Sequence, residues 1–364
     1  MIIEIDRSVI GLASSSAASL SSVISTLELI AISYREGNHL VFAEPSITIE
    51  LLGLVANRSE LATALLLRVK NKHPQTATIA NNVKVKLLIG SFDSAYVEET
   101  KNCRIIKYPA TALTSNTVQK TIILVENLTD IKFYKWIANT ILANTSCKGV
   151  SLAIEGYPGG GNTTAEAYEN IKENTSRLCL CIVDSDIRAP GLSPGDTAKK
   201  VRKHDRSTPS PRVNHHIIDS CSIENLIPFA FFEHAWKEDR ILTNRLDIYR
   251  PHYRSNHWKY LQLKKHITCF EVRDQSAFSI YWKAHFMDVA TGCTTEDRSC
   301  SKKSECAQHK LTSLSSAPLA AVLSLQEEEM HNIPYDLLPD IKQAWEEISY
   351  ELLSWCCAAP SSTL

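Results

Sequence analysis

The chain has 364 residues, of which 44% are hydrophobic, and its formal net charge at pH 7 is -1. This length is enough for a buried core and long for one domain, so two domains, or one domain with large additions, are expected. The near-neutral charge excludes a protein that attracts nucleic acid through a global basic field. Any nucleic-acid binding must therefore use a local basic patch.

The first ten residues carry Glu4, Asp6 and Arg7 and lack the layout of a signal peptide. The most apolar stretches, such as residues 27–33 and 61–69, are interrupted by charge or are far shorter than a membrane span. Eleven cysteines, an odd number, fit a reducing compartment better than a disulfide scaffold. We therefore expect a soluble cytoplasmic protein without a membrane segment.

Residues 1–115 form a first region with a Ser/Ala-rich start, apolar segments at 40–55 and 61–69, and strand-like alternation at 83–89. No motif in this region can be tied to chemistry, so docking, regulation or dimerisation is the role we expect for it. The polar residues 114–119 indicate a boundary. We predict three parts, which are residues 1–115, a core at 116–240 and an extension at 241–364.

Strands alternate with helices in the core, which predicts an α/β fold with a parallel sheet flanked by helices and ligand groups at the carboxyl ends of the strands. The predicted strands are 121–125, 150–154, 178–183 and a shorter one at 215–219. The predicted helices are 130–142, 164–174 and 224–236, with a turn at 156–161 and a long loop at 188–214. The extension at 241–364 is mixed and mostly helical, with helices expected near 325–331 and 341–355.

Acidic side chains follow three of the predicted strands near the point where each strand ends. Glu126 follows the first, Asp184 and Asp186 follow the third, and Glu224 comes shortly after the fourth. The carboxyl ends of parallel strands converge on one edge, where several carboxylates would repel each other unless a cation binds between them. Mg²⁺ prefers oxygen ligands and keeps water, which suits phosphate chemistry. We therefore expect a site for Mg²⁺, or Mn²⁺, at this edge.

Two details of local geometry support this site. If the strand continues through Asp184-Ser-Asp186, both carboxylates point the same way. Asp130 lies four residues after Glu126, so one helical turn would bring it beside that glutamate. Taken singly, each acid could also be an ordinary helix cap or a solvated group.

Four segments of the core resemble the motifs of Toprim domains, most closely those of OLD-type and related defence nucleases. They are Leu124-Val-Glu-Asn-Leu-Thr-Asp130, the Gly159-Gly-Gly161 turn, Val183-Asp-Ser-Asp186 and Ser222-Ile-Glu-Asn225. The resemblance covers about residues 119–235 and depends on the order of the motifs, each behind its own strand. A lone Asp-x-Asp after a strand occurs in many other metal and sugar-nucleotide enzymes.

The resemblance implies a Toprim-like Rossmannoid sheet and a metal-dependent nuclease that hydrolyses phosphodiester bonds of DNA or RNA. It makes Glu126 a metal ligand and possible general base, and it places Lys264 near the scissile phosphate. Asn127 stands where the family usually has glycine, which puts the close approach of the backbone there in doubt. The metal ligands that it implies are Glu126, Asp130, Asp184, Asp186, Ser222 and Glu224. The catalytic residues that it implies are Glu126, Asp184, Asp186, Glu224 and Lys264.

Members of this branch commonly act with an ATPase or another sensor, and the chain contains no GxxxxGK[ST] motif. The resemblance thus implies an antiphage defence effector controlled by a separate ATPase or sensor subunit, and a homodimer is also compatible. The alternatives are another Toprim enzyme, such as a primase or topoisomerase, and a non-catalytic Toprim interaction subunit. The chain has little room for the gate domains of a topoisomerase.

Three secondary features remain open. The loop at 188–212 is rich in Lys and Arg and could guide a phosphate backbone, or it could be a solvated loop. The aromatic and basic residues at 249–257 could stack on single-stranded nucleic acid, although an ordinary surface is the more natural interpretation. The third feature is a group of residues whose irregular spacing could fit Zn²⁺ or simply free thiols. Its members are Cys293, Cys300, Cys306 and His309.

Overall fold

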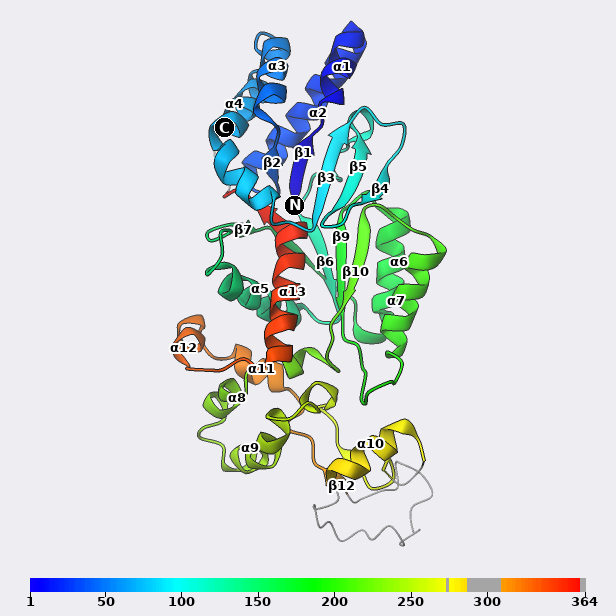
Figure 1. Ribbon diagram of the computed structural model, residues 1–364, viewed down its shortest axis with the longest axis vertical. Coiled ribbons are helices and arrows are strands. Elements are labelled where there is room, and N and C mark those ends of the chain that lie inside the picture. The colour runs from blue at the N-terminus through cyan, green and yellow to red at the C-terminus, as the bar shows by residue number, and fades with distance from the viewer. Residues whose placement is uncertain (273–274, 287–308, 361–364) are drawn as a thin grey trace. The chain divides into compact units, whose positions relative to one another are not determined.

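The computed structural model describes residues 1–272, 275–286 and 309–360, and its contacts form two compact units (Figure 1). The first unit comprises residues 1–182, 200–216 and those from 345 onward, and the second comprises residues 183–199 and 217–344. The first unit therefore unites most of the predicted core with residues 1–115.

A five-stranded sheet forms the N-terminal part of the first unit. Its order is β2-β1-β3-β5-β4, in which β1 pairs in parallel with β2 and β3, β3 pairs in parallel with β5, and β4 runs antiparallel to β5. The alternation at 83–89 predicted β3, which is confirmed. The strands are β1 (Ile2–Ile5), β2 (Leu40–Phe42), β3 (Val85–Gly90), β4 (Tyr96–Glu99) and β5 (Arg104–Pro109), followed by the short helix η1 (Ala110–Ala112).

Four helices accompany this sheet, and the apolar segments at 40–55 and 61–69 lie largely within two of them. The helix α2 begins at Ser16, whose hydroxyl accepts a hydrogen bond from the backbone N–H of Ser19 at 3.0 Å. Two buried hydroxyls of α2 tie it to the segment that leaves the sheet, because Thr26 donates to the carbonyl of Ala110 and Ser33 to that of Val118, each at 2.7 Å. The helices are α1 (Ser8–Ser15), α2 (Ala17–Arg35), α3 (Pro45–Val55) and α4 (Glu60–Ala80).

By length and composition, α2 is the one helix among the described residues that could cross a membrane. Buried core helices of soluble proteins pass the same test. In the first unit, Leu27 and Ile30 of α2 are almost fully buried, and the helix contacts α1 and α4. From the sequence we expect no membrane segment here, because the most apolar stretches are interrupted by charge or are far shorter than a membrane span.

The second sheet of the first unit is parallel and has the order β8-β6-β9-β10. The α/β class predicted for the core is thus confirmed. The two central strands are completely buried, since every residue of β6 and β9 lies in the core. This is the pattern of a parallel sheet covered on both faces. The strands are β6 (Thr121–Val125), β8 (Ile154–Pro158), β9 (Cys179–Val183) and β10 (Val213–Ile217), and β7 (Ser151–Leu152) pairs separately with β13 (Cys357–Ala358).

The glycine-rich segment after residue 155 differs from the prediction. We expected a turn from residue 156, but β8 continues to Pro158, where it pairs with Val125 of β6. Pro158 is tolerated because it ends an edge strand. Position 156 inside the strand requires glycine, because a Cβ there would approach the side chain of Ile131 on α5 (Leu128–Leu142) to 2.6 Å. The turn itself is limited to Gly159–Gly161, where Gly160 and Gly161 have positive φ angles.

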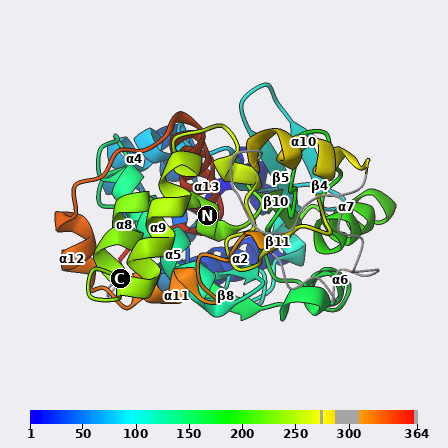
Figure 2. The same cartoon turned by 90° about the horizontal axis from the view of Figure 1, so that it is seen from below.

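Helices cover both faces of this sheet, with α5 and α13 on one side and α6 and α7 on the other (Figures 1 and 2). The core on one side includes Trp345 of α13, whose ring lies 5.3 Å from that of Trp136 on α5. The helices are α5 (Leu128–Leu142), α6 (Thr164–Asn174), α7 (Asp196–Ser207) and α13 (Pro339–Cys356), together with the short helix η2 (Gly161–Thr163).

The helix α7 corrects the prediction of a structureless loop at 188–214. A buried polar network holds it, because Asp205 of α7 accepts hydrogen bonds from Tyr168 at 2.5 Å and from Lys172 at 3.2 Å, both on α6. The Asp205 carboxylate also pairs with His215 on β10. Burial alone would raise the pKa of Asp205, but the hydrogen bonds from His215 and Tyr168 hold it below its usual value. These contacts lie far apart in sequence, and composition alone does not reveal them.

The second unit is mostly helical, as predicted for the extension. The helix expected at 224–236 is divided, because Pro228 separates η3 from α8. Proline lacks an N–H and disfavours a helical conformation of the residue before it, which explains the break. The elements are η3 (Ile223–Leu226), α8 (Phe229–Ala235), α9 (Arg240–Tyr253), η4 (Trp258–Tyr260), β11 (Ile267–Thr268), α10 (Ala277–Phe286), β12 (His309–Leu311), α11 (Pro318–Leu323) and α12 (Glu327–Asn332).

Candidate functional site

Each strand of the parallel sheet leads into one of the four motifs. Glu126 directly follows β6 and Asp184 directly follows β9, and these neighbouring strands run in parallel with Leu124 opposite Cys181. Ser222 and Glu224 lie shortly after β10, and the three glycines follow β8. Glu126 and Asp130 belong to the first unit. The candidate residues that belong to the second unit are Asp184, Asp186, Ser222, Glu224 and Lys264.

In the second unit, the Asp184–Asp186 loop lies against the segment that precedes Glu224. The backbone N–H of Asp186 donates to the carbonyl of Cys221 at 2.9 Å, and the hydroxyl of Ser185 donates to the carbonyl of Ser220 at 2.5 Å. Asp184 accepts a hydrogen bond from the backbone N–H of Ile223 at 3.0 Å. The second unit thus brings together two motifs that are almost forty residues apart in sequence.

The geometry of the Asp-Ser-Asp segment differs from the expectation of a continued strand. The strand ends at Val183, and Asp186 has a φ angle of 53°, in the left-handed region. The two carboxylates therefore do not follow the alternation of a strand. Aspartate is among the residues that tolerate this conformation best, and such conformations are enriched at functional sites.

Asp186 is exposed as a whole residue, but its carboxyl group is partly buried against neighbouring segments. Burial raises the pKa of its carboxyl, and the nearby charges of Lys265, Lys264 and Arg188 partly offset that rise. Gly195 lies directly against it, because a Cβ at this position would approach the Asp186 carboxylate to 2.4 Å. Any larger residue at position 195 would displace the carboxylate.

Glu224 is the most deeply buried acid of the site, with a side-chain exposure of 3%. One of its oxygens, Oε1, lies 2.8 Å from the ammonium group of Lys264. The other, Oε2, is buried and has no hydrogen-bond partner in the described part of the chain. A buried carboxylate oxygen without a partner is costly unless positive charge compensates it, and Lys264 contacts only the other oxygen.

Ser222 and Asn225 hold the turn that carries Glu224. The side-chain carbonyl of Asn225 accepts hydrogen bonds from the backbone N–H of Ser222 at 2.9 Å and from its hydroxyl at 3.1 Å. The amide of Asn225 then donates to the carbonyls of Trp258 and Leu261, at 2.7 and 2.9 Å. This links the turn to the segment that leads to Lys264.

In the first unit, Asp130 acts as a helix cap. Its carboxylate accepts a hydrogen bond from the backbone N–H of Asn127 at 2.9 Å, which completes a capping box at the start of α5. The backbone next to Glu126 is fastened to the glycine turn, because Gly160 donates to the carbonyl of Glu126 at 3.1 Å. Glu126 thus lies at the end of β6, and Asp130 lies in the first turn of α5.

Among the described residues, no three His, Cys, Asp or Glu side chains gather in a group that could hold a metal ion. The case for a metal therefore depends on the order of the strands and on the unpartnered oxygen of Glu224. Three of the residues considered for Zn²⁺, which are Cys293, Cys300 and Cys306, lie outside the described residues, as does the side chain of His309.

The basic residues at 188–212 separate into two groups. Exposed lysines and arginines lie on α7, whereas Arg212 is structural, since it donates to the carbonyl of Thr175 at 2.6 Å. The stretch at 249–257 offers no open stacking surface, because Tyr249 and Tyr253 are buried and Arg250 pairs with Glu233. The exposed basic residues of α7 are Lys199, Lys200, Arg202, Lys203 and Arg206.

Sequence reasoning missed residues that act on the site. Lys265 could have been found from its place beside Lys264, but Arg188 and Gly195 belong to none of the sequence motifs. Arg188 forms an ion pair with Glu271 at 3.1 Å and lies over the ring of Phe278 while it faces Asp186. Its influence on the site follows only from the fold.

Comparisons with known proteins complete this description. No protein-family model matches the chain, and neither the curated proteins nor the solved structures include a significant match to it.

Proposed function

We propose that this chain is a Toprim-type, Mg²⁺-dependent nuclease that hydrolyses phosphodiester bonds of DNA or RNA. One observation carries the proposal: the four neighbouring strands of one parallel sheet each lead into one of the four motifs, in the order β8-β6-β9-β10. In parallel sheets, ligands bind beyond the carboxyl ends of the strands. Acids behind three adjacent strands are thus in the place where such folds do chemistry.

The side chains of the motifs offer oxygen donors, which a divalent cation such as Mg²⁺ prefers. Glu126, Asp184, Asp186 and Glu224 would hold it, with Ser222 and Asp130 as further oxygen donors in the family's pattern. When bound, Mg²⁺ supplies charge neutralisation at the scissile phosphate and lowers the pKa of a coordinated water. The buried, unpartnered Oε2 of Glu224 supports this assignment, because a cation would compensate its charge.

The chain's own side chains have separate roles in the proposal. Glu126 accepts the proton of the attacking water as a general base. Lys264, whose side chain is 44% exposed, places positive charge where a phosphate can approach it. The exposed lysines and arginines of α7 attract the backbone of the nucleic acid through charge, which serves DNA and RNA alike.

The biological setting follows from the resemblance of the motifs. We propose a cytoplasmic antiphage defence effector that a separate ATPase or sensor subunit controls. A homodimer is compatible with this role.

The direct test is cleavage of labelled double-stranded DNA, single-stranded DNA and a transfer-RNA pool by the purified chain, with Mg²⁺, Mn²⁺ or EDTA. We expect metal-dependent cutting of at least one substrate. Glu126→Gln and Asp184→Asn should each lower the rate by about two orders of magnitude or more, since each removes a charge that the reaction needs.

Glu173→Gln is the matched control, because Glu173 is an exposed acid of α6 outside the motifs, and its variant should cut like the parent chain. Cutting that persists in EDTA, or that Asp184→Asn leaves unchanged, would contradict the proposal. If the isolated chain is silent, the same variants are compared after co-purification with its cellular partners, and silence there too counts against a nuclease.

A non-catalytic interaction subunit is the second candidate, and one contact favours it. The ammonium group of Lys264 lies 2.8 Å from one oxygen of Glu224, so this oxygen is compensated without a metal. The two candidates differ in whether the chain cleaves a nucleic acid in the presence of metal. A nuclease requires Mn²⁺ or Mg²⁺ binding that Asp184→Asn and Glu224→Gln weaken, whereas the interaction subunit shows no turnover on any substrate.

A further inference from the structure

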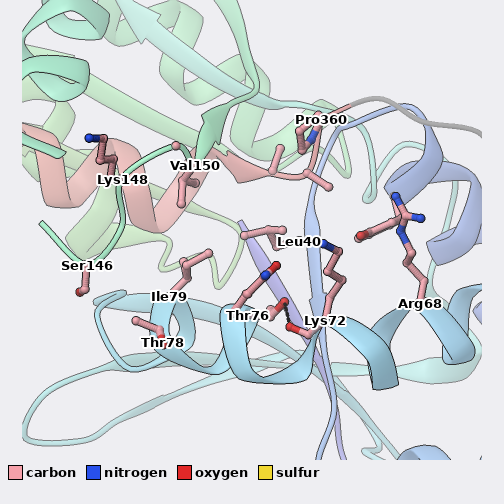
Figure 3. Close-up of a pocket in the computed structure, with 15 residues that line it drawn as sticks. Leu40, Arg68, Lys72, Thr76, Thr78, Ile79, Ser146, Lys148, Val150 and Pro360 are labelled. Carbon is pink, nitrogen blue, oxygen red and sulfur yellow. Dashed lines mark hydrogen bonds between the residues drawn. The ribbon is translucent and has the colours of Figure 1, made fainter. Parts of the chain in front are cut away.

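The first unit contains a cavity that no residue of the four motifs lines. It has a volume of about 550 Å³ and lies between α4, the segment from Ser146 to Val150, and the end of β13. Figure 3 shows Arg68, Lys72 and Thr76 on α4 at one side, with Val150 and Pro360 across from them. This volume falls in the range of about 300–1,000 Å³ that is common for small-molecule sites.

The spacing of residues on α4 explains why one helix supplies so much of the wall. Arg68, Lys72, Thr76 and Ile79 all line the cavity and follow each other at intervals of three or four residues, and Gln75 beside Thr76 also lines it. Residues at these intervals lie on the same face of a helix. The exposed Lys70 is two residues from both Arg68 and Lys72 and does not line the cavity.

Charge is the second feature of the cavity. Arg68, Lys72 and Lys148 line it, and no Asp or Glu does among the residues that the structure describes. None of these three cations forms an ion pair with a described carboxylate, and the Nε of Arg68 is buried without a hydrogen-bond partner in the described residues. Three cations without acids around one cavity favour an anion, and an arginine with free donors suits a phosphate in particular.

The rest of the wall indicates what else the ligand carries. Leu40, Ile79 and Val150 offer apolar surface, while Gln75 and Thr78 offer both donors and acceptors. Inorganic phosphate would fill only a small part of the volume and would leave the apolar surface uncovered. A flat heterocycle that packs on aliphatic side chains and hydrogen-bonds at its edge uses both kinds of group.

We propose that this cavity binds a phosphorylated nucleotide, with its phosphate on Arg68, Lys72 and Lys148 and its base against the apolar wall. The site is independent of the proposed nuclease centre, whose acids lie on other segments. It gives the first unit a ligand-binding role that the motifs do not indicate.

The test is isothermal titration calorimetry on the full chain in EDTA, which removes binding through metal ions. AMP, ATP, adenosine, pyrophosphate and inorganic phosphate are titrated in turn. We expect AMP or ATP to bind, and adenosine to bind about tenfold or more weakly, because charge-assisted hydrogen bonds to phosphate are lost. Pyrophosphate should also bind more weakly than ATP, because it lacks the base.

Variants on α4 locate the binding. Lys72→Ala and Arg68→Ala should each weaken it by about tenfold, whereas the matched control Lys70→Ala should change it less than about twofold. If Arg68→Ala fails to fold, Lys148→Ala takes its place, because Lys148 is exposed. Equal losses from Lys70→Ala and Lys72→Ala would overturn the proposal. Binding of adenosine as tight as that of AMP, or no binding of any phosphate compound at millimolar concentration, would do the same.

Discussion

His257 in the second unit lies among other aromatic and imidazole rings. Its ring centre is 3.9 Å from that of His285 on α10 and 5.9 Å from that of His252 on α9, and Tyr281 packs at its edge. Burial and, to a smaller extent, the neighbouring His285 and His252 together lower the pKa of His257 to about 4. This surrounding therefore favours the neutral form of the His257 imidazole.

This surrounding predicts a pH dependence of stability. An unfolded histidine titrates near pH 6.5, so the folded state binds fewer protons than the unfolded state between about pH 6.5 and 4. The free energy of unfolding should fall as the pH is lowered through that window. His257→Phe should flatten the fall in urea denaturation curves measured from pH 7.5 to 4.5.

The exposed His331 provides the comparison, since His331→Gln should leave the pH profile of the parent chain unchanged. A profile that His257→Phe does not alter would mean that another group dominates the acid sensitivity. Asp205, whose folded pKa is also lowered, loses its contribution only as the pH falls below about 4, so the two can be separated.

Single residues of the site were predictable to different degrees. Glu126, Asp184 and Glu224 could be predicted because they follow strands, and buried strands can be recognised in the sequence as apolar runs. Lys264 was proposed only from a family pattern, as a residue near the scissile phosphate. Its pairing with Glu224 was not predicted, because nothing local links residues forty positions apart. The left-handed conformation of Asp186 was not predictable, since it depends on Gly195 and on hydrogen bonds to a distant loop.

At the scale of elements, the capping box of α5 gives Asp130 a structural role that can be measured. Asp130→Ala leaves the N–H of Asn127 without its acceptor and should lower the free energy of unfolding by about 1 kcal/mol. Asp130→Asn keeps an acceptor oxygen and should recover most of that loss. Chemical denaturation of the parent chain and both variants provides the values.

The same pair of variants separates capping from metal binding. Asn restores the cap but removes the negative charge that a metal ligand contributes. A cleavage rate that drops in Asp130→Asn while stability stays near that of the parent chain would assign Asp130 to the metal site. A stability that Asp130→Ala leaves unchanged would argue against the cap.

Elements were predicted well where the apolar pattern is strong. The run at 121–125 and the helix at 164–174 match β6 and α6 at both ends. The helix α7 was missed because its surroundings are rich in Pro and Ser and its own residues are mostly charged. Its stability depends on Val201 and Ala198, which are buried, and on the contacts of Asp205. Such tertiary contacts override local composition.

At the scale of the whole molecule, the first unit depends on residues from the end of the chain. Trp345 and Trp355 of α13 are fully buried in it, and the carbonyl of Trp355 accepts a hydrogen bond from Thr121 of β6 at 2.5 Å. The hydroxyl of Ser354 accepts one from the backbone N–H of Lys84 at 2.8 Å. The α13 helix thus joins both sheets of this unit.

Trp345→Ala should therefore destabilise the first unit by about 3–5 kcal/mol, the usual cost of removing a large buried ring. Thermal unfolding followed by circular dichroism measures the effect. Glu346→Ala changes the exposed neighbour on the same helix and should shift the midpoint by less than about 2 °C. A chain with Trp345→Ala that unfolds like the parent would contradict the role of α13.

This organisation could not be predicted from sequence. We predicted three consecutive parts, whereas the contacts define units that the chain leaves and re-enters at residues 182, 199, 216 and 344. Composition shifts mark boundaries between consecutive segments, but they carry no information about which distant segments share a core. Only the amphipathic pattern of 341–355 indicated that the end of the chain packs against something.

The buried thiols of the first unit have a chemical consequence. Burial raises the pKa of Cys179, Cys181 and Cys356, so these sulfurs stay protonated, and a protonated thiol is a poor nucleophile. No cysteine in the described part of the chain forms a disulfide, and most are buried. Oxidants therefore react poorly with these three thiols while the first unit is folded. Oxidation of these three thiols therefore follows the opening of the first unit and does not cause it. The rate at which a thiol reagent labels them measures the rate of that opening.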